Sequence, residues 1–117
     1  MDIDQLIPST LTLGATMYTI VLRNNEWCLE HGCHGQVRWP DMEMDIVTEG
    51  QAPSEIANTL IHECLHLCYR EWQIKPKCGE ERTVTSLGFA LTALYAQNPD
   101  LMAGVQSLLE LTNAEGN

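Results

Sequence analysis

The sequence has few basic residues, no long apolar run and no Asn-x-Ser/Thr glycosylation site. Its 117 residues include 6 Lys and Arg against 16 Asp and Glu, and the basic residues are scattered along the chain rather than gathered in a stripe. Because binding a nucleic-acid backbone requires a basic surface, we expect no nucleic-acid partner. No apolar stretch approaches the length that spans a bilayer, so we expect no membrane partner either.

The first residues also lack the features of a secretory signal. Residues 1–4 are acidic, and neither a basic region nor a long apolar region follows them. The five cysteines are an odd number, so free thiols in a reducing compartment explain them more simply than disulfides do. These features predict a cytoplasmic protein.

The composition favours a single α+β domain. A chain of 117 residues that is 44% hydrophobic can build one modest core, so we expect one domain over residues 1–117. Residues 1–52 are predicted to be mainly extended, and residues 53–111 to be helical. The sequence shows no internal repeat and no low-complexity segment.

Three segments of the first half are predicted to be strands. Residues 12–23 are rich in β-branched and aromatic side chains and end at the turn signal Asn24-Asn25, although 17–22 could form a short helix instead. Two shorter candidates, 36–39 and 43–47, are separated by a Pro-Asp turn. The last of them alternates polar and apolar residues, as a half-buried strand does.

Three helices are predicted in the second half. The first begins at Pro53, with Ser54 as N-cap, and Pro and Gly in residues 73–79 then turn the chain back. The second begins near Glu80, and its apolar residues recur at steps of three and four. It stops at Asn98-Pro99, which is typical of the start of a third helix, here extending through Leu111.

The motif His62-Glu63-Cys64-Leu65-His66, within the first of these helices, has the most specific chemistry. Two histidines four residues apart present both imidazoles on one face, where one Zn²⁺ can bind them, with Glu63 next to the metal-bound water. Cys64 and Cys68 fall on the opposite, apolar face, which predicts buried thiols rather than metal ligands. The alternative is a surface helix that carries both histidines without a metal.

A catalytic zinc needs a third protein ligand. Glu81 lies in the first turn of the second helix, on a stripe that can face the motif helix after an antiparallel turn. Glu80 is the competing candidate, because helical phase does not separate two adjacent residues at a helix start. The explanation without a metal is a solvated acidic first turn, which the helix dipole favours.

A second group of soft donors could hold a structural zinc. Cys28, His31, Cys33 and His34 lie within seven residues. A closed zinc site usually has two separated ligand pairs, so Cys78 would have to help. The alternative is a polar hairpin loop with incidental Cys and His.

Residues 59–66, 80–87 and 98–99 together resemble the small gluzincin-type metallopeptidase domains of phages and prophages, which are relatives of the ImmA/IrrE type. The resemblance covers residues 44–101. In that family a pattern Glu-x-x-apolar-x-x-apolar supplies the third zinc ligand, and it matches Glu81 followed by Val84 and Leu87. The resemblance also implies a small antiparallel sheet packed on the motif helix, followed by two further helices.

The resemblance further implies that the strand nearest the cleft offers its edge to an extended peptide. We expect residues 43–47 to be this strand, with Met44, Asp45 and Ile46 as the substrate-binding edge.

These features predict a zinc-dependent metalloendopeptidase that acts on a protein in the cytoplasm, which is the host cytoplasm if the protein is phage-encoded. Zn²⁺ bound by His62, His66 and Glu81 would activate a water molecule, and Glu63 would be the general base. The activity could be latent, with residues 28–39 covering the cleft.

Several features of the site stay open at this point. One alternative function is a non-catalytic zinc-binding module, a phage or prophage regulator that binds a host protein. Another is a helical interaction protein without a metal. Four residues are of a type that could stabilise an oxyanion, and the sequence does not choose among them: Tyr69, Tyr95, His31 and His34.

Overall fold

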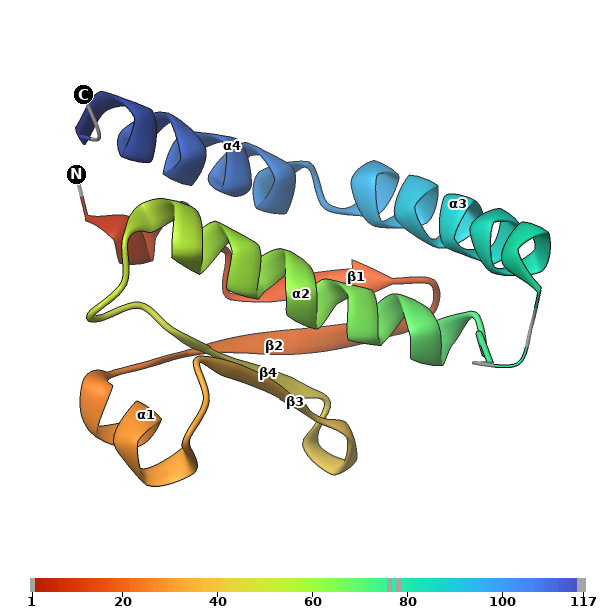
Figure 1. Cartoon of the computed structure of the whole chain (residues 1–117), viewed down its shortest axis with the longest axis horizontal. Coiled ribbons are helices and arrows are strands. Elements are labelled where there is room, and N and C mark those ends of the chain that lie inside the picture. The colour runs from red at the N-terminus through yellow and green to blue at the C-terminus, as the bar shows by residue number, and fades with distance from the viewer. Residues whose placement is uncertain (1, 76, 78, 116–117) are drawn as a thin grey trace.

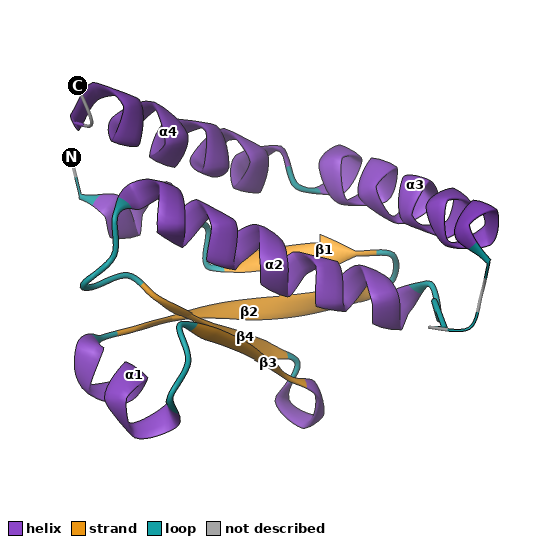
Figure 2. Ribbon diagram, in the orientation of Figure 1, coloured by secondary structure: helices purple, strands orange, loops and turns teal. Residues whose placement is uncertain are grey.

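A computed structural model describes residues 2–75, 77 and 79–115, with the backbone alone described for 112–115 (Figures 1 and 2). The elements follow in the order η1 (Ile3–Leu6), β1 (Thr10–Leu13), β2 (Thr16–Arg23), α1 (Asn25–His31), β3 (Gly35–Arg38), η2 (Trp39–Asp41), β4 (Glu43–Val47), α2 (Pro53–Glu71), α3 (Glu80–Gln97) and α4 (Pro99–Glu115). Helix α2 lies across one face of the sheet, and α3 and α4 lie end to end alongside α2 (Figure 2). The α+β class predicted from the sequence is confirmed.

The four strands of the sheet have the spatial order β1-β2-β4-β3. The two outer pairs are antiparallel, whereas β2 and β4 in the middle are parallel. The predicted antiparallel sheet is therefore wrong at its central pair. The chain leaves β2 through α1 and forms β3 before β4, and this longer path brings β4 back in the direction of β2.

The first predicted strand, residues 12–23, is a hairpin of two strands. Gly14 lies in the turn between β1 and β2 with φ 64°, a conformation that glycine adopts without steric cost. Residues 16–23 form strand β2, in which Tyr18 and Ile20 are buried. The short helix considered for residues 17–22 is therefore wrong.

Helix α1 is an unpredicted helix in the half of the chain that is predicted to be mainly extended. The Asn24 side chain accepts a hydrogen bond from the Trp27 N–H at 2.9 Å and so caps the first turn. Gly32 ends the helix with φ 70°, and its N–H bonds to the Cys28 carbonyl at 2.8 Å. Both signals are present in the sequence as an Asn before the segment and a Gly after it.

The predicted C-terminal helices are present with small differences at their ends. Ala52, not Ser54, caps α2, and the Glu55 carboxylate accepts a hydrogen bond from the Ala52 N–H at 2.9 Å. Helix α3 begins at Glu80 as predicted, and α4 continues past Leu111. Pro76, which belongs to the predicted turn between α2 and α3, lies outside the described residues. Within the described residues, no helix is long and apolar enough to cross a bilayer.

The core lies between the sheet and the helices. Its apolar residues come from β1, β2 and β4 on one side and from α2, α3 and α4 on the other. Helix α4 can approach η1 closely because residue 104 is glycine, since a Cβ there would lie 2.0 Å from the Leu6 carbonyl oxygen. The largest fully buried side chains of α2 are Ile56, Leu60 and Leu67.

The outer edge of β1 is closed by amide side chains from the junction of α3 and α4. The Asn98 amide accepts from the Thr12 N–H at 2.7 Å and donates to the Thr12 carbonyl at 2.6 Å. The Gln97 amide makes the same two bonds to Gly14, at 2.8 and 3.0 Å. These side chains occupy the backbone groups that would otherwise be available to another strand.

Candidate functional site

Helix α2 places His62, Glu63 and His66 side by side, as the motif predicts. The two imidazole ring centroids are 5.0 Å apart, and His62 Nε2 lies 3.9 Å from Glu63 Oε2. Both histidines are exposed, while Glu63 turns toward the sheet. The four-residue spacing sets the shared face of the imidazoles, and the position next to His62 sets the inward direction of Glu63.

Glu63 is a buried carboxylate with little polar compensation. The residue is only 6% exposed, and among the described residues its one ionic contact within 4.0 Å is His62 Nε2. Burial raises the pKa of Glu63, and the nearby imidazoles oppose this rise in part. A carboxylate that is desolvated in this way binds a proton more readily than a surface carboxylate, which suits a general base.

Gly35 at the start of β3 makes room for Glu63. A Cβ at residue 35 would lie 2.7 Å from Thr59 Cγ2 and 3.2 Å from Glu63 Cγ. Any side chain at this position would therefore push α2 away from β3 or displace the carboxylate. Sequence reasoning missed this residue, although a glycine directly before a predicted strand can signal a close approach of two backbones.

The predicted substrate-binding edge, residues 43–47, is wrong. β4 pairs with β2 on one side and with β3 on the other, and Met44, Asp45 and Ile46 are fully buried. The edge position of this strand was an expectation from the family resemblance. Its hairpin partner β3 takes the outer position instead, so β3 is the edge strand beside Glu63.

The backbone groups of Gly35 and Val37 point away from the sheet. The Val47 N–H donates to the His34 carbonyl at 2.9 Å. Hydrogen-bonded and non-bonded residues alternate in an antiparallel pair, so Gln36 and Arg38, opposite Asp45 and Glu43, are also bonded to β4. Gly35 and Val37 are the non-bonded residues of β3, and their N–H and C=O groups point outward. The edge of β3 therefore offers main-chain donors and acceptors beside the motif.

Asp45 has a structural environment rather than a substrate-binding one. Its buried carboxylate accepts hydrogen bonds from Arg23, Arg38 and Gln36, at 2.8 to 3.2 Å. Burial by itself raises the pKa of Asp45, but these three partners outweigh it and hold the pKa below its usual value. The network ties β2, β3 and β4 together on the sheet face opposite α2.

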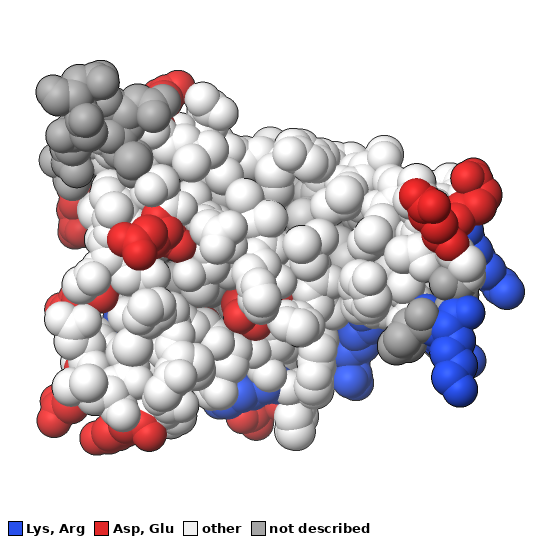
Figure 3. All heavy atoms as spheres, viewed as in Figure 1, with Lys and Arg blue, Asp and Glu red and all other residues white. Residues whose placement is uncertain are grey.

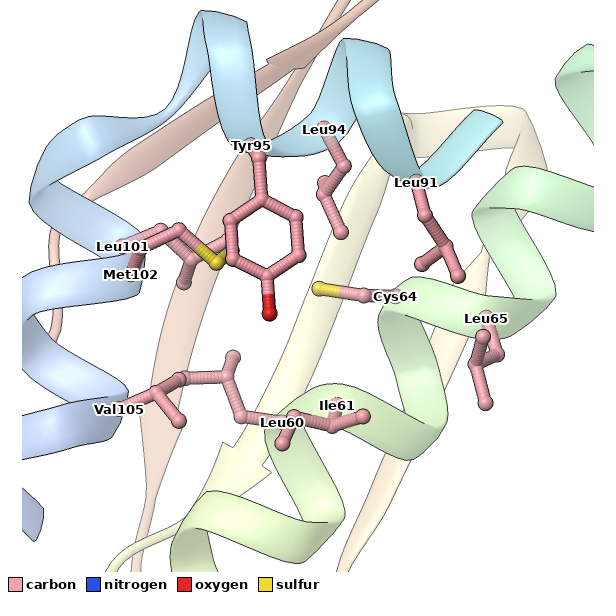
Figure 4. A pocket seen from close by; sticks show the side chains of 10 residues that line it. All are labelled: Leu60, Ile61, Cys64, Leu65, Leu91, Leu94, Tyr95, Leu101, Met102 and Val105. Carbon is pink, nitrogen blue, oxygen red and sulfur yellow. The ribbon is translucent and has the colours of Figure 1, made fainter. Parts of the chain in front are cut away.

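Neither candidate for the third zinc ligand reaches the histidines. Leu65 of α2 and Leu91 of α3 line the same apolar cavity, and Glu81 lies ten residues before Leu91, or about 15 Å along the helix (Figure 4). No three His, Cys, Asp or Glu side chains of the described residues form a group that could hold a metal. Glu81 and Glu80 are both exposed, so the third ligand stays a prediction.

The first turns of α3 pack loosely. None of residues 80–89 is buried, and Val84, expected on the apolar stripe below Glu81, is 56% exposed. Only Ala90 and Leu94 of this helix are buried. The part of α3 that carries Glu81 is therefore held by few core contacts.

The apolar cavity between α2, α3 and α4 has a volume of about 80 Å³ (Figure 4). The Cys64 side chain points into it, and burial raises the pKa of this thiol to about 12. Cys68 is also buried, with a pKa raised to about 11 by burial. The prediction of buried thiols at these two positions is confirmed, and neither is a reactive thiolate at neutral pH.

The four donors of the second candidate zinc site are not brought together. Cys28, Cys33 and His34 line one surface hollow. The His31 ring instead stacks on Trp27 at 4.1 Å, and its Nδ1 lies 2.8 Å from the Trp27 carbonyl oxygen. Cys78 lies outside the described residues. The arrangement gives no support to a second zinc.

Two further predictions can be compared with the structure. Of the four residues considered for oxyanion stabilisation, Tyr69 lies seven positions after His62 and so shares its helix face, whereas Tyr95 lines the apolar cavity. The segment 28–39, considered as a detachable cover, includes β3. Because β3 is a strand of the sheet, displacing this segment would break the pairing of β3 with β4.

No protein-family model, curated protein or solved structure matches this chain. The functional assignment therefore depends on the motif and on the geometry around Glu63.

Proposed function

We propose that the chain is a zinc-dependent endopeptidase. The observation that carries this proposal is the buried carboxylate of Glu63, which lies beside two exposed imidazoles and next to the open edge of β3. A structural zinc site has no use for such a carboxylate, because its four positions are closed by ligands. A hydrolase needs a base and a place for an extended peptide, and in this proposal Glu63 is the base and the open edge of β3 holds the peptide.

Two of the ligands that a zinc ion needs are present side by side on α2. His62 and His66 present nitrogen ligands from one helix face, and the poorly compensated Glu63 carboxylate is where a metal-bound water would need a base. Glu81 remains the proposed third ligand and would have to approach with the loosely packed start of α3. Zinc bound there would polarise the scissile carbonyl and acidify its water.

The chain's own groups have separate tasks in the proposed reaction. The outward N–H and C=O of Val37 and Gly35 pair with the main chain of the substrate. Glu63 takes a proton from the attacking water and passes it to the leaving amine. Tyr69, on the same helix face as the histidines, is the proposed donor to the oxyanion.

The test combines zinc content with peptide hydrolysis for the wild type and two variants. Glu63→Gln should keep zinc but lose about 100-fold or more in rate, because the base is removed. Glu30→Gln, which changes an exposed carboxylate on α1, is the matched control and should behave like the wild type. Wild-type hydrolysis by Glu63→Gln would contradict the role of Glu63.

The third ligand is tested by metal affinity. Zinc competition with a chelator should show affinity about 100-fold weaker for Glu81→Ala, the effect of losing one of three protein ligands, and unchanged for the neighbouring Glu80→Ala. The reverse result would move the ligand to Glu80. Equal zinc affinity in both variants and the wild type would mean that neither Glu80 nor Glu81 of α3 is a zinc ligand.

One observation favours a second candidate, the non-catalytic zinc-binding interaction module. Val84 and Tyr95 are eleven residues apart, which places them on one face of α3, and both are largely exposed. Such a face could bind another protein. Stoichiometric zinc without hydrolysis of any peptide in a diverse library would favour this candidate.

A further inference from the structure

We infer that the proposed peptidase selects substrates with acidic side chains on the N-terminal side of the cleaved bond. The inference rests on the proposed function and adds a substrate class to it. Its basis is a cluster of three basic residues, Arg70, Lys75 and Lys77, which we call the basic turn. They lie within eight residues of one another, at the end of α2 and just after it, and Arg70 contacts Trp39 directly after β3.

The basic turn stands out in an acidic protein. The chain has only 6 Lys and Arg, and two of them, Arg23 and Arg38, are bound to the Asp45 carboxylate. The three side chains of the basic turn are exposed, and no carboxylate of the described residues lies within 4.0 Å of them. Figure 3 shows most of the positive side chains at the lower right of this face, with acidic side chains above them and others toward the left.

Contacts between α2 and the β3 hairpin locate the basic turn relative to the motif. The start of β3, at Gly35, lies against Thr59 and Glu63. Trp39, directly after β3, lies under Arg70, whose Cζ is 4.5 Å from the centre of the indole. The strand and the helix therefore run in the same direction, and the basic turn lies beyond the C-terminal end of β3 (Figure 1).

This arrangement fixes which part of a substrate meets the basic turn. Antiparallel pairing is the more stable way to add a strand, so the substrate would run opposite to β3, with its N-terminal part toward Arg70. Arg70 lies seven residues after Glu63, or about 10 Å along the helix, which is about three residues of an extended chain. Acidic side chains are therefore favoured from about the third to the fifth residue before the cleaved bond.

The expected selectivity is that of exposed ion pairs. One such pair changes a rate constant for peptide capture by about two- to fivefold at low salt, and less as salt screens the charges. The remaining surface repels acidic segments because the formal net charge is −10. The same charge distribution that attracts an acidic segment to the basic turn therefore disfavours it elsewhere along the edge.

The inference is tested with zinc-loaded protein and a random peptide library, with cleavage sites identified by mass spectrometry at low and high salt. Asp and Glu should be enriched about two- to fivefold at the third to fifth positions before the bond, and salt should reduce the enrichment. Lys75→Gln should weaken the enrichment. Gln5→Glu, which makes the same change in net charge on η1, should leave it unchanged.

The outcomes separate the inference from the proposed function. Cleavage without acidic enrichment, or with enrichment only after the bond, overturns the inference and leaves the peptidase intact. Equal effects of Lys75→Gln and Gln5→Glu also overturn it, because the basic turn would then have no special place. Absence of cleavage by the zinc-loaded wild type overturns the proposed function, and the inference with it.

Discussion

The two edges of the sheet are treated in opposite ways. On the β1 edge, the amide groups of Gln97 and Asn98 bond to the N–H and C=O of Gly14 and Thr12. On the β3 edge, the outward groups of Gly35 and Val37 make no such bond to any described residue. The closed edge faces the junction of α3 and α4, and the open edge runs beside Glu63.

One edge of the sheet is blocked and the other is open. An unpaired edge invites association with other chains, so proteins usually block it. Here one edge is blocked by side chains that imitate a strand, while the other is left open where the candidate base lies. The proposed function uses this open edge as the place where the substrate pairs.

The largest effect is expected when the network that holds the open edge in place is removed. Asp45→Ala leaves Arg23 and Arg38 without their buried partner and should cost about 3–5 kcal/mol in unfolding free energy, measured with urea. Asp41→Ala, which removes an exposed partner of Arg38, should cost less than about 1 kcal/mol. Similar losses in both variants would mean that Asp45 does not hold β3.

The same carboxylate predicts a direction of pH dependence. Because the pKa of Asp45 is lowered in the folded state, its contribution to stability is present above the ordinary aspartate pKa. It is lost as the pH falls through the lower folded value. Urea unfolding of the wild type should show this loss at acidic pH, and Asp45→Asn should show a smaller one.

Opening the closed edge should have the next largest effect. Asn98→Ala removes three hydrogen bonds of a buried amide, to Thr12 N–H, Thr12 C=O and Leu94 C=O, and should destabilise the fold by about 2–3 kcal/mol. Gln97→Ala, which changes an exposed amide, should cost about 1 kcal/mol or less. Sedimentation at rising concentration should show more self-association of Asn98→Ala than of the wild type. A monomeric, equally stable Asn98→Ala would refute the blocking role.

Closing the open edge should affect catalysis more than stability. Val37→Pro removes an outward N–H, a change that edge strands tolerate, and should slow peptide hydrolysis about tenfold, the effect of one or two lost hydrogen bonds. Gln36→Pro removes an N–H that bonds to β4 and should instead destabilise the protein. Unchanged hydrolysis by a folded Val37→Pro would place the substrate elsewhere.

The smallest effect concerns Glu63 without metal. Its pKa is raised in the folded state, so stability falls as the pH rises from the ordinary glutamate pKa to the folded value. Glu63→Gln should therefore be more stable than the metal-free wild type by about 1 kcal/mol at pH 7, and the gain should vanish near pH 4. Calorimetry across this range measures it, with Glu30→Gln as the unaffected control.

The sequence predicted the elements that depend on local signals. The periodicity of α2 and α3 and the Asn98-Pro99 boundary located the three long helices. The long-range pairing was not predictable in the same way, because no local signal says that β4 pairs with β2 as well as β3. That pairing decided which strand is the edge, and so the error at Met44, Asp45 and Ile46 followed from topology rather than from composition.

The candidate site divides along the same line. His62, Glu63 and His66 lie on one helix, so helical geometry alone brings them together. Gly35 and Val37 come from a strand distant in sequence, and their role depends on how closely α2 packs on β3. The placement of Glu81 depends on packing between two helices, which the spacing of apolar residues does not determine.

The close contact at Gly35 has an evolutionary consequence. A Cβ at residue 35 would collide first with Thr59 and next with the Asp45 carbonyl and Glu63. In a library randomised at positions 35 and 59 and selected for folded protein, a larger residue at 35 should survive only with a smaller one at 59. Selection for activity should leave glycine alone at 35, since the shift that relieves the collision also moves the carboxylate. Mutational tolerance at this one position would therefore differ between the two selections.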